Sequence, residues 1–123
     1  MSQAGGNFAN ADQALIHRFL KGDGSPFPID SNPFARALRS ELWVVDQGRQ
    51  QVAIEFDPDP LFTQGTGVLQ GGAVSAMLDF AMAFAVLARV PIGVSCATVT
   101  MTSSFLRAAP QGRYRAVGEI ERY

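Results

Sequence analysis

The fold of this chain is decided by one stretch, Leu69-Gln-Gly-Gly-Ala-Val-Ser-Ala-Met-Leu-Asp79-Phe-Ala-Met-Ala-Phe-Ala-Val-Leu-Ala-Arg89. Between Gly71 and Ala88 the only charged residue is Asp79. A helix that is apolar on every side belongs in a protein core or in a membrane. A charge buried in either place is costly unless it is paired, so we expect Asp79 to have a partner or a chemical role.

We expect this helix to run from Gln70 to about Arg89, because a proline and a glycine follow it. Its length of roughly 30 Å would be enough to cross a membrane. Asp79 and the strands predicted on either side favour the core of a soluble domain instead, since a membrane span would leave those strands without a core.

The composition is typical of one soluble globular domain. Of 123 residues, 47% are hydrophobic and 17% are charged. The formal net charge of −1 predicts neither a nucleic acid nor a membrane surface as a partner. A single cysteine, Cys96, and a single histidine, His17, argue against a disulfide and a metal site, and we expect no cofactor. The N-terminus lacks the pattern of a signal peptide, so we expect a cytoplasmic protein.

The rest of the chain predicts strands on both sides of the apolar helix. Residues 41–46 and 51–57 predict a hairpin, since apolar and polar side chains alternate in the second run. Residues 95–106 are rich in β-branched residues and predict a third strand, and residues 113–123 predict a fourth. We therefore predict an α+β domain in which an antiparallel sheet wraps around the helix.

The beginning of the chain predicts a segment of its own. Residues 10–20 place Leu15, Ile16 and Phe19 at helical spacing, and a run rich in glycine ends that helix. We expect residues 1–26 to form an N-terminal segment with a short helix and residues 27–123 to form the main domain.

Four residues of the apolar helix form a candidate site. Ser75 and Asp79 lie four residues apart and share a helix face. Gly71 and Gly72 begin the helix, where free N–H groups and the helix dipole can hold a carbonyl oxygen or an oxyanion. Gly71 and Asp79 lie about 12 Å apart along the axis, too far to act on one atom within one chain. A site shared between two copies would solve this geometry.

Simpler interpretations of the same residues stay open. Asp79 could pair with an arginine or cap a backbone group, and the glycine pair could serve close helix packing. Ser75 has the size of an ordinary residue at a helix contact.

The motif Gln64-Gly-Thr-Gly-Val-Leu-Gln70-Gly71-Gly72, followed by Leu78-Asp79 and by the stretch from Thr98 to Pro110, resembles the hotdog-fold thioesterase superfamily. Within it, the chain is similar to the phenylacetic-acid-degradation (PaaI-like) type of acyl-CoA thioesterase, over roughly residues 33–123. The resemblance implies a hotdog fold, a curved antiparallel sheet around one long central helix. In the family the sheet continues beyond the position of Tyr123, so we expect one or two C-terminal strands to be lacking.

The resemblance also implies catalytic roles. Asp79 matches the family's catalytic carboxylate, which acts as nucleophile or as general base toward water. The N–H of Gly71, from a partner subunit, matches the group that polarises the thioester carbonyl. Gln64 stands where the family has an asparagine or another amide that supports the oxyanion hole, and Thr98 where a serine or threonine orients the nucleophile or water.

Four further residues are expected to bind substrate. Gln70 stands where the family pattern has a histidine, and Gly72 follows Gly71 at the helix start. Ser75 shares the helix face of Asp79, and Arg107 could meet the phosphates of coenzyme A.

The function predicted from this resemblance is hydrolysis of a small or medium acyl- or aryl-CoA by a homodimer or homotetramer. The alternative is a hotdog protein that binds acyl-CoA or a lipid without catalysis. A hotdog dehydratase is a weaker alternative, because its chemistry uses a histidine and His17 lies far from the site in the sequence.

Overall fold

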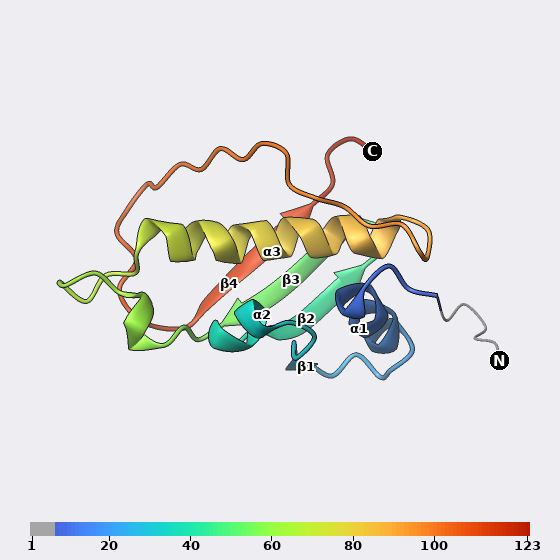
Figure 1. Cartoon of the computed structure of the whole chain (residues 1–123), viewed down its shortest axis with the longest axis horizontal. Coiled ribbons are helices and arrows are strands. Elements are labelled where there is room, and N and C mark those ends of the chain that lie inside the picture. Colours follow the sequence, from blue (N-terminus) through green and yellow to red (C-terminus); the bar gives the residue numbers. More distant parts are fainter. Residues whose placement is uncertain (1–6) are drawn as a thin grey trace.

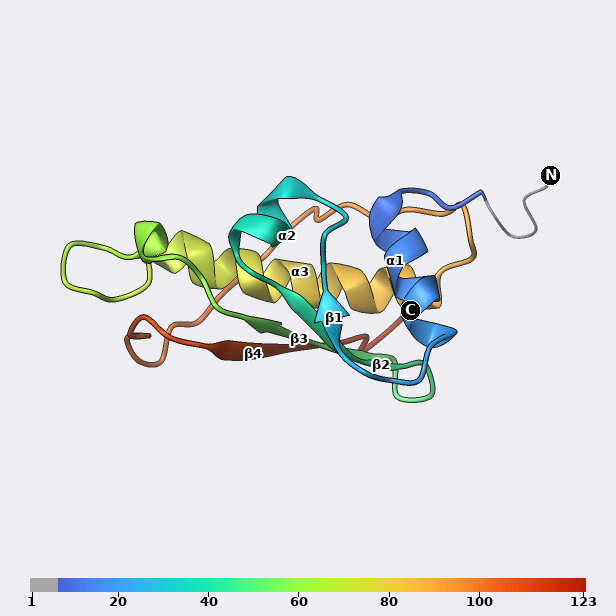
Figure 2. The same cartoon turned by 90° about the horizontal axis from the view of Figure 1, so that it is seen from below.

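The computed structural model describes residues 7–123 and has three α-helices on one face of an antiparallel sheet (Figures 1 and 2). The elements are α1 (Ala11–Leu20), β1 (Phe27–Pro28), α2 (Pro33–Ala37), β2 (Glu41–Asp46), β3 (Gln51–Phe56), a 3-10 turn (Pro60–Phe62), α3 (Gly71–Arg89) and β4 (Tyr114–Glu119). The strands lie in the order β1-β2-β3-β4, and all neighbours are antiparallel. The predicted α+β arrangement around one long helix is confirmed.

The sheet face of α3 is lined by small and apolar residues. Ala73, Met77, Ala81 and Ala85 recur every four residues, and all four are buried. At Gly118 in β4 the backbone of the sheet lies so near α3 that an added Cβ would be 2.1 Å from the carbonyl oxygen of Ala81. The helix and the sheet therefore touch through backbone atoms, and no larger residue fits between them.

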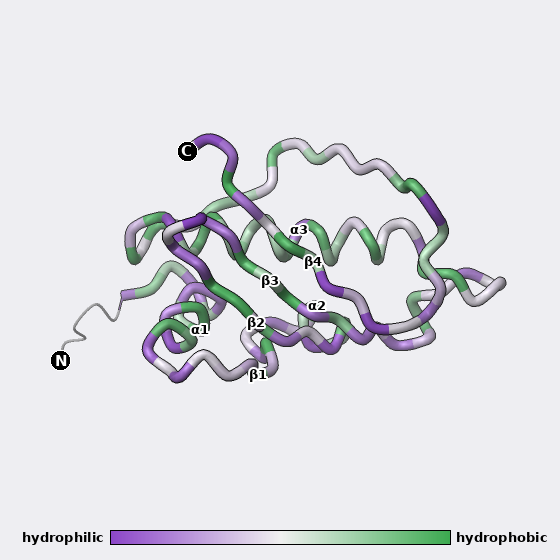
Figure 3. Tube along the Cα trace, turned by 180° about the vertical axis from the view of Figure 1, so that it is seen from behind, coloured by the Kyte–Doolittle hydropathy of each residue, from purple (hydrophilic) through white to green (hydrophobic). Residues whose placement is uncertain are grey.

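The strand β3 shows the expected alternation except at Ala53, which is also buried. Val52, Ile54 and Phe56 of β3 are buried under α3, while Glu55 points to the outer face with Arg113 and Arg115. Figure 3 shows the hydrophobic colouring along β3 and in bands along α3. The predicted hairpin of residues 41–46 and 51–57 is confirmed, with a register shift between Leu42 and Val44.

The helix α1 belongs to the same core as α3, since Leu15, Ile16 and Phe19 are buried in one cluster with residues of α3 and the sheet. Gln13, which has no exposed surface, joins α1 to the loop after α3. Its side-chain oxygen accepts from the N–H of Gly93 at 3.1 Å, and its amide nitrogen donates to the carbonyl of Val94 at 3.3 Å. The division of the chain at residue 26 stays a prediction.

The prediction of a strand at residues 95–106 is wrong. The segment forms no regular element and arches alongside α3 (Figure 1). Within the described part of the chain, its backbone makes no backbone–backbone hydrogen bond. Its β-branched composition favours an extended chain, but a strand also requires a neighbour to complete its ladder. We name residues 95–106 the crossing segment.

The expectation that α3 is buried on every side is also wrong. Leu78 is 37% exposed and Met82 is 42% exposed, although both are large apolar residues. They lie between the sheet face of α3 and the face under the crossing segment. By length and composition α3 is the one helix among residues 7–123 that could cross a membrane, yet its sheet face is packed in the core.

Candidate functional site

Asp79 lies half-buried near the middle of α3 and faces the crossing segment. The hydroxyl of Thr98 donates to Oδ1 of Asp79 at 2.6 Å. None of the four ion pairs found among residues 7–123 includes Asp79, so within this part of the chain its partner is a hydroxyl rather than an arginine. A carboxylate held by one neutral donor keeps a free oxygen for water or for a substrate.

An open cavity of about 190 Å³ adjoins Asp79. It is lined by Asp79, Met82, Ala83, Val86, Cys96, Ala97, Thr98 and Thr100. Burial raises the pKa of the Cys96 thiol, and the charge of Asp79 raises it further. The thiol is therefore held in its neutral form beside the carboxylate.

Three contacts attach the crossing segment to α3. Besides the bond from Thr98 to Asp79, the hydroxyls of Ser75 and Ser103 lie 3.3 Å apart. The Cys96 sulfur lies 3.9 Å from the carbonyl oxygen of Ala83. The segment thus runs antiparallel to the helix, and Ser75, a predicted substrate-binding residue, is engaged with the segment itself.

The N-terminus of α3 forms a second cavity. Gln70 provides no side-chain cap, and among the described residues no acceptor bonds to the N–H of Gly71 or Gly72. Free N–H groups at a helix start attract negative charge. The adjoining cavity, of about 260 Å³, is lined by Gln64, Val68, Leu69, Gly71, Val74, Phe105, Arg107, Ala108 and Ala109.

The remaining predicted residues face a third opening. Gln70 and Gly72 line a hollow of about 350 Å³ together with Phe34, Leu61, Phe62, Thr63 and Ala73. The structure therefore brings Gln64, Gly71 and Arg107 together, and separately brings Asp79 and Thr98 together. Since α3 is continuous from Gly71 to Arg89, the two groups lie about 12 Å apart along it.

Sequence reasoning missed Phe105, whose ring lies 3.7 Å from the position of a Cβ added at Gly71. No spacing in the sequence could reveal this neighbour, because it comes from the irregular crossing segment. Among residues 7–123, no three His, Cys, Asp or Glu side chains are placed to share a metal ion.

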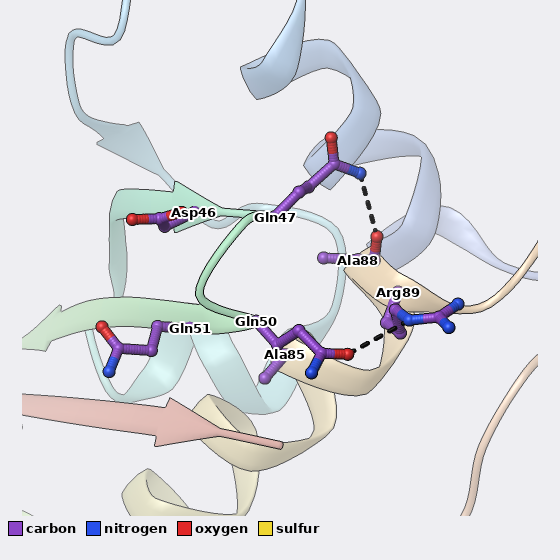
Figure 4. Close-up of a pocket in the computed structure, with 7 residues that line it drawn as sticks. All are labelled: Asp46, Gln47, Gln50, Gln51, Ala85, Ala88 and Arg89. Atoms are coloured by element: carbon purple, nitrogen blue, oxygen red, sulfur yellow. Dashed lines mark hydrogen bonds between the residues drawn. The ribbon is translucent and has the colours of Figure 1, made fainter. Parts of the chain in front are cut away.

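A further pocket lies at the opposite end of α3, remote from the predicted site (Figure 4). Gln47 donates to the carbonyl of Ala88 at 3.1 Å, and Arg89 donates to the side-chain oxygen of Gln50 at 3.1 Å. The bond from Gln47 occupies one free carbonyl of the helix end, and both bonds join this end to the β2–β3 turn.

Similarity to known proteins agrees with this geometry. A family model of the thioesterase superfamily matches residues 66–123. The chain is 30% identical to a phenylacetic acid degradation-related protein of Ralstonia eutropha JMP134 that is assigned to the thioesterases, with a TM-score of 0.75 over 88% of this chain and 78% of that one. The chain belongs to the thioesterase superfamily. The resemblance to its PaaI-like type is confirmed.

Two more solved structures share the fold of this thioesterase family member. The PaaI protein of the E. coli phenylacetic acid degradation operon is 17% identical, with a TM-score of 0.66 over 94% of this chain and 75% of that one. Zebrafish thioesterase superfamily member 2 is 19% identical, with a TM-score of 0.65 over 94% and 77% of the two chains. No curated protein sequence matches the chain.

Proposed function

We propose that this protein is a cytoplasmic acyl-CoA thioesterase whose active site forms between two copies of the chain. The proposal rests on one observation above all. Asp79, oriented by Thr98, and the uncapped N-terminus at Gly71 open into different cavities of the same chain. Each half has one part of the chemistry of thioester hydrolysis, and the two parts meet when Asp79 of one copy faces Gly71 of another.

Catalysis would begin with the thioester carbonyl at the start of α3. The N–H of Gly71 and the positive end of the helix dipole would hold its oxygen and stabilise the negative charge that develops there. Gln64 lines the same cavity and would support this oxyanion hole through its amide. Such donors are effective because they are fixed before the reaction begins.

Asp79 would supply the attacking group. As a general base, its free oxygen takes a proton from water, and the resulting hydroxide adds to the carbonyl carbon. As a nucleophile, the same oxygen adds to the carbon itself and forms an anhydride, which water then hydrolyses. In both routes the C–S bond breaks and coenzyme A leaves as a thiolate that takes up a proton. Thr98 would fix the carboxylate through the bond to Oδ1.

Arg107 is the arginine best placed for the phosphates of coenzyme A. It is exposed at the cavity of Gln64 and Gly71. Arg113 and Arg115, by contrast, are engaged by Glu55 on the outer face of the sheet. Gln70 and Gly72 would contact the substrate from the neighbouring hollow, which also contains Phe34 and Phe62. A small or medium acyl or aryl group fits such a lining.

The test is the rate of thiol release from a panel of acyl- and aryl-CoA thioesters. Asp79→Asn keeps the shape and an acceptor for Thr98, so kcat should fall by about 10³-fold while the fold is retained. Retained kcat would contradict the assignment. If the natural chain bound acyl-CoA tightly but released no thiol, the protein would be a non-catalytic acyl-CoA-binding member of the family.

The route can be read from isotope incorporation. In a single turnover in ¹⁸O-labelled water, label in the carboxylate of Asp79, detected by mass spectrometry of the peptide, identifies a nucleophile whose anhydride is opened by water at the Asp79 carbonyl carbon. An anhydride opened at the acyl carbon instead places the label in the acid product. A general base leaves Asp79 unlabelled and places the label in the acid product only.

A further inference from the structure

The turn that follows α3 is held by one buried side chain of α1, Gln13, whose amide has four hydrogen bonds to backbone groups. The amide nitrogen donates to the carbonyls of Pro91 and Val94, each at 3.3 Å. The amide oxygen accepts from the N–H of Gly93 at 3.1 Å and from that of Ala9 at 2.8 Å. A glutamine amide has two donor and two acceptor positions, so all four are filled. A reversed amide would bring donor against donor, and its orientation is therefore fixed.

The four residues from Pro91 to Val94 form one compact turn. The N–H of Val94 donates to the carbonyl of Pro91 at 3.0 Å. Gly93, the third residue, has a φ of +94°, in the region that a type II turn requires at this position and that glycine adopts without strain. Gln13 binds the first, third and fourth residues of the turn. The turn is therefore fixed to α1, which lies beside it (Figures 1 and 2).

The crossing segment begins directly after this turn, and Thr98 follows Val94 by four residues. The Cys96 sulfur lies 3.9 Å from the carbonyl oxygen of Ala83, and the Thr98 hydroxyl lies 2.6 Å from Asp79. The two positions on α3 are four residues apart, a rise of about 6 Å. Two residues of extended chain span about 6.6 Å. The segment and the helix therefore keep in step here, and the start of the segment determines which residue reaches Asp79.

A displacement of the segment by one residue would take the hydroxyl away from Asp79. The neighbours of Thr98 are Ala97 and Val99, whose side chains have no hydrogen-bonding group. Val99 is 95% exposed and points away from the helix. Side chains alternate along an extended chain, so the same displacement would also turn Thr98 outward. The bond to Asp79 thus depends on the register that is set at the turn.

We propose that Gln13 is a positioning residue of the site: it fixes the turn after α3 and so determines that Thr98 is the residue that meets Asp79. Gln13 lies outside the cavity of Asp79 and acts through Thr98. Its effect on catalysis rests on the proposed function, in which Thr98 orients the attacking carboxylate. Its effect on the placement of the crossing segment does not.

The placement can be measured without activity, because Cys96 lies between the turn and Thr98 and is half-buried against α3. Gln13→Met keeps the length of the side chain and removes all four bonds. Iodoacetamide should label Cys96 about fivefold faster or more in the folded variant, since the start of the segment is released. The matched control is Ile16→Val, which removes a buried methyl group from the same helix and keeps Gln13. It should be labelled at the natural rate.

The catalytic effect is measured as thiol release per folded molecule, with the folded fraction taken from circular dichroism. Gln13→Met should lower kcat by about tenfold and change KM by less than about twofold, because the residue does not contact substrate. Combined with Thr98→Val, it should lower kcat no further than Thr98→Val alone, because Gln13 acts through that hydroxyl. A purely structural role would multiply the two losses, to about 100-fold.

The proposal is overturned if folded Gln13→Met is labelled at the natural rate, or if the two losses in kcat multiply. If Gln13→Met does not fold, Gln13→Glu takes its place. It keeps an acceptor for Gly93 and loses both donors, so it should release the carbonyls of Pro91 and Val94 and again speed the labelling. A natural chain that releases no thiol would contradict the proposed function, and the labelling rate would then decide the placement by itself.

Discussion

The two long faces of α3 differ in how completely they are packed. The sheet face, represented by Ala81 and Met77, is buried and touches backbone at Gly118. Among residues 7–123, the opposite face, represented by Asp79, is covered by the crossing segment, which is attached by three side-chain hydrogen bonds and by the ring of Phe105 near Gly71. Packing of the first face can stabilise a single chain. The second face presents polar side chains, such as Asp79, to an open cavity, where a substrate or a second copy could reach them. We infer that folding and function are divided between the two faces of one helix.

The largest expected loss of stability comes from a substitution where the sheet meets α3. Gly118→Ala would place a Cβ 2.1 Å from the carbonyl oxygen of Ala81, and backbone atoms cannot yield to it. Urea denaturation should show a loss of about 3 kcal/mol or more in the free energy of unfolding. Val117→Ala, one residue away on the exposed face, should change it by less than about 0.5 kcal/mol. A loss below about 1 kcal/mol for Gly118→Ala would show that the close packing is unimportant.

The next largest difference in stability is expected between alanine substitutions at two neighbouring residues of α3. Met77 is 4% exposed and Leu78 is 37% exposed. Met77→Ala should therefore cost about 2–5 kcal/mol, as cavities in a core do. Leu78→Ala should cost about 1 kcal/mol or less in dilute solution, where the chain is not assembled. Equal losses in urea unfolding would mean that the two faces are packed alike.

On the face of α3 that lies under the crossing segment, the loss of one hydroxyl should affect catalysis more than stability. Thr98→Val removes the hydroxyl that donates to Asp79 and keeps the shape of the side chain. We expect kcat for thioester hydrolysis to fall by about tenfold, because the carboxylate loses its fixed orientation. Thr100→Val alters another threonine of the same cavity and should leave kcat near its natural value. An equal effect of both variants on kcat would show that Thr98 has no specific role in the site.

The smallest expected effect concerns Cys96. The charge of Asp79 adds to burial in raising the pKa of this thiol. Asp79→Asn removes that charge, so the pKa should fall and more thiolate should be present at a given pH below it. Iodoacetamide should then label Cys96 faster, and the midpoint of the rate profile should move to lower pH. An unchanged profile would mean that residue 79 is neutral or distant.

The sequence was sufficient to predict the elements of the core and insufficient for the segment that crosses α3. Alternation in residues 51–57 predicted the hairpin, and the apolar run around Asp79 predicted that α3 exists and where it ends, but not which of its faces is buried. The crossing segment has the composition of a strand, but composition cannot supply a neighbouring strand. The contribution of Gln13 to the core was missed because a polar side chain is buried only when its partners, such as Gly93, come from distant residues.

The candidate site shows the same limit. The helix spacing predicted that Gly71 and Asp79 lie too far apart for one atom, and the continuous α3 places them in separate cavities. The contact between Thr98 and Asp79 followed from the family resemblance, not from the local pattern. The ring of Phe105 over Gly71 could not be predicted, because it depends on the path of the irregular crossing segment.

The division between the two halves of the site can be tested by mixing inactive subunits. Gly71→Pro removes the N–H at the first helical position, where proline is tolerated, and the extended backbone of Gln70 suits a following proline. Gly71→Ala keeps the N–H and is the control. Both Gly71→Pro and Asp79→Asn should be nearly inactive alone.

The most direct measurement is thiol release after the two inactive variants are dissociated, mixed in equal amounts and reassembled. If Asp79 of one copy acts with Gly71 of another, half of the pairs are mixed and each has one intact site, so about a quarter of the natural activity should return. If both groups act within one chain, every site has a defect and no activity should return. That second result would contradict a site shared between copies.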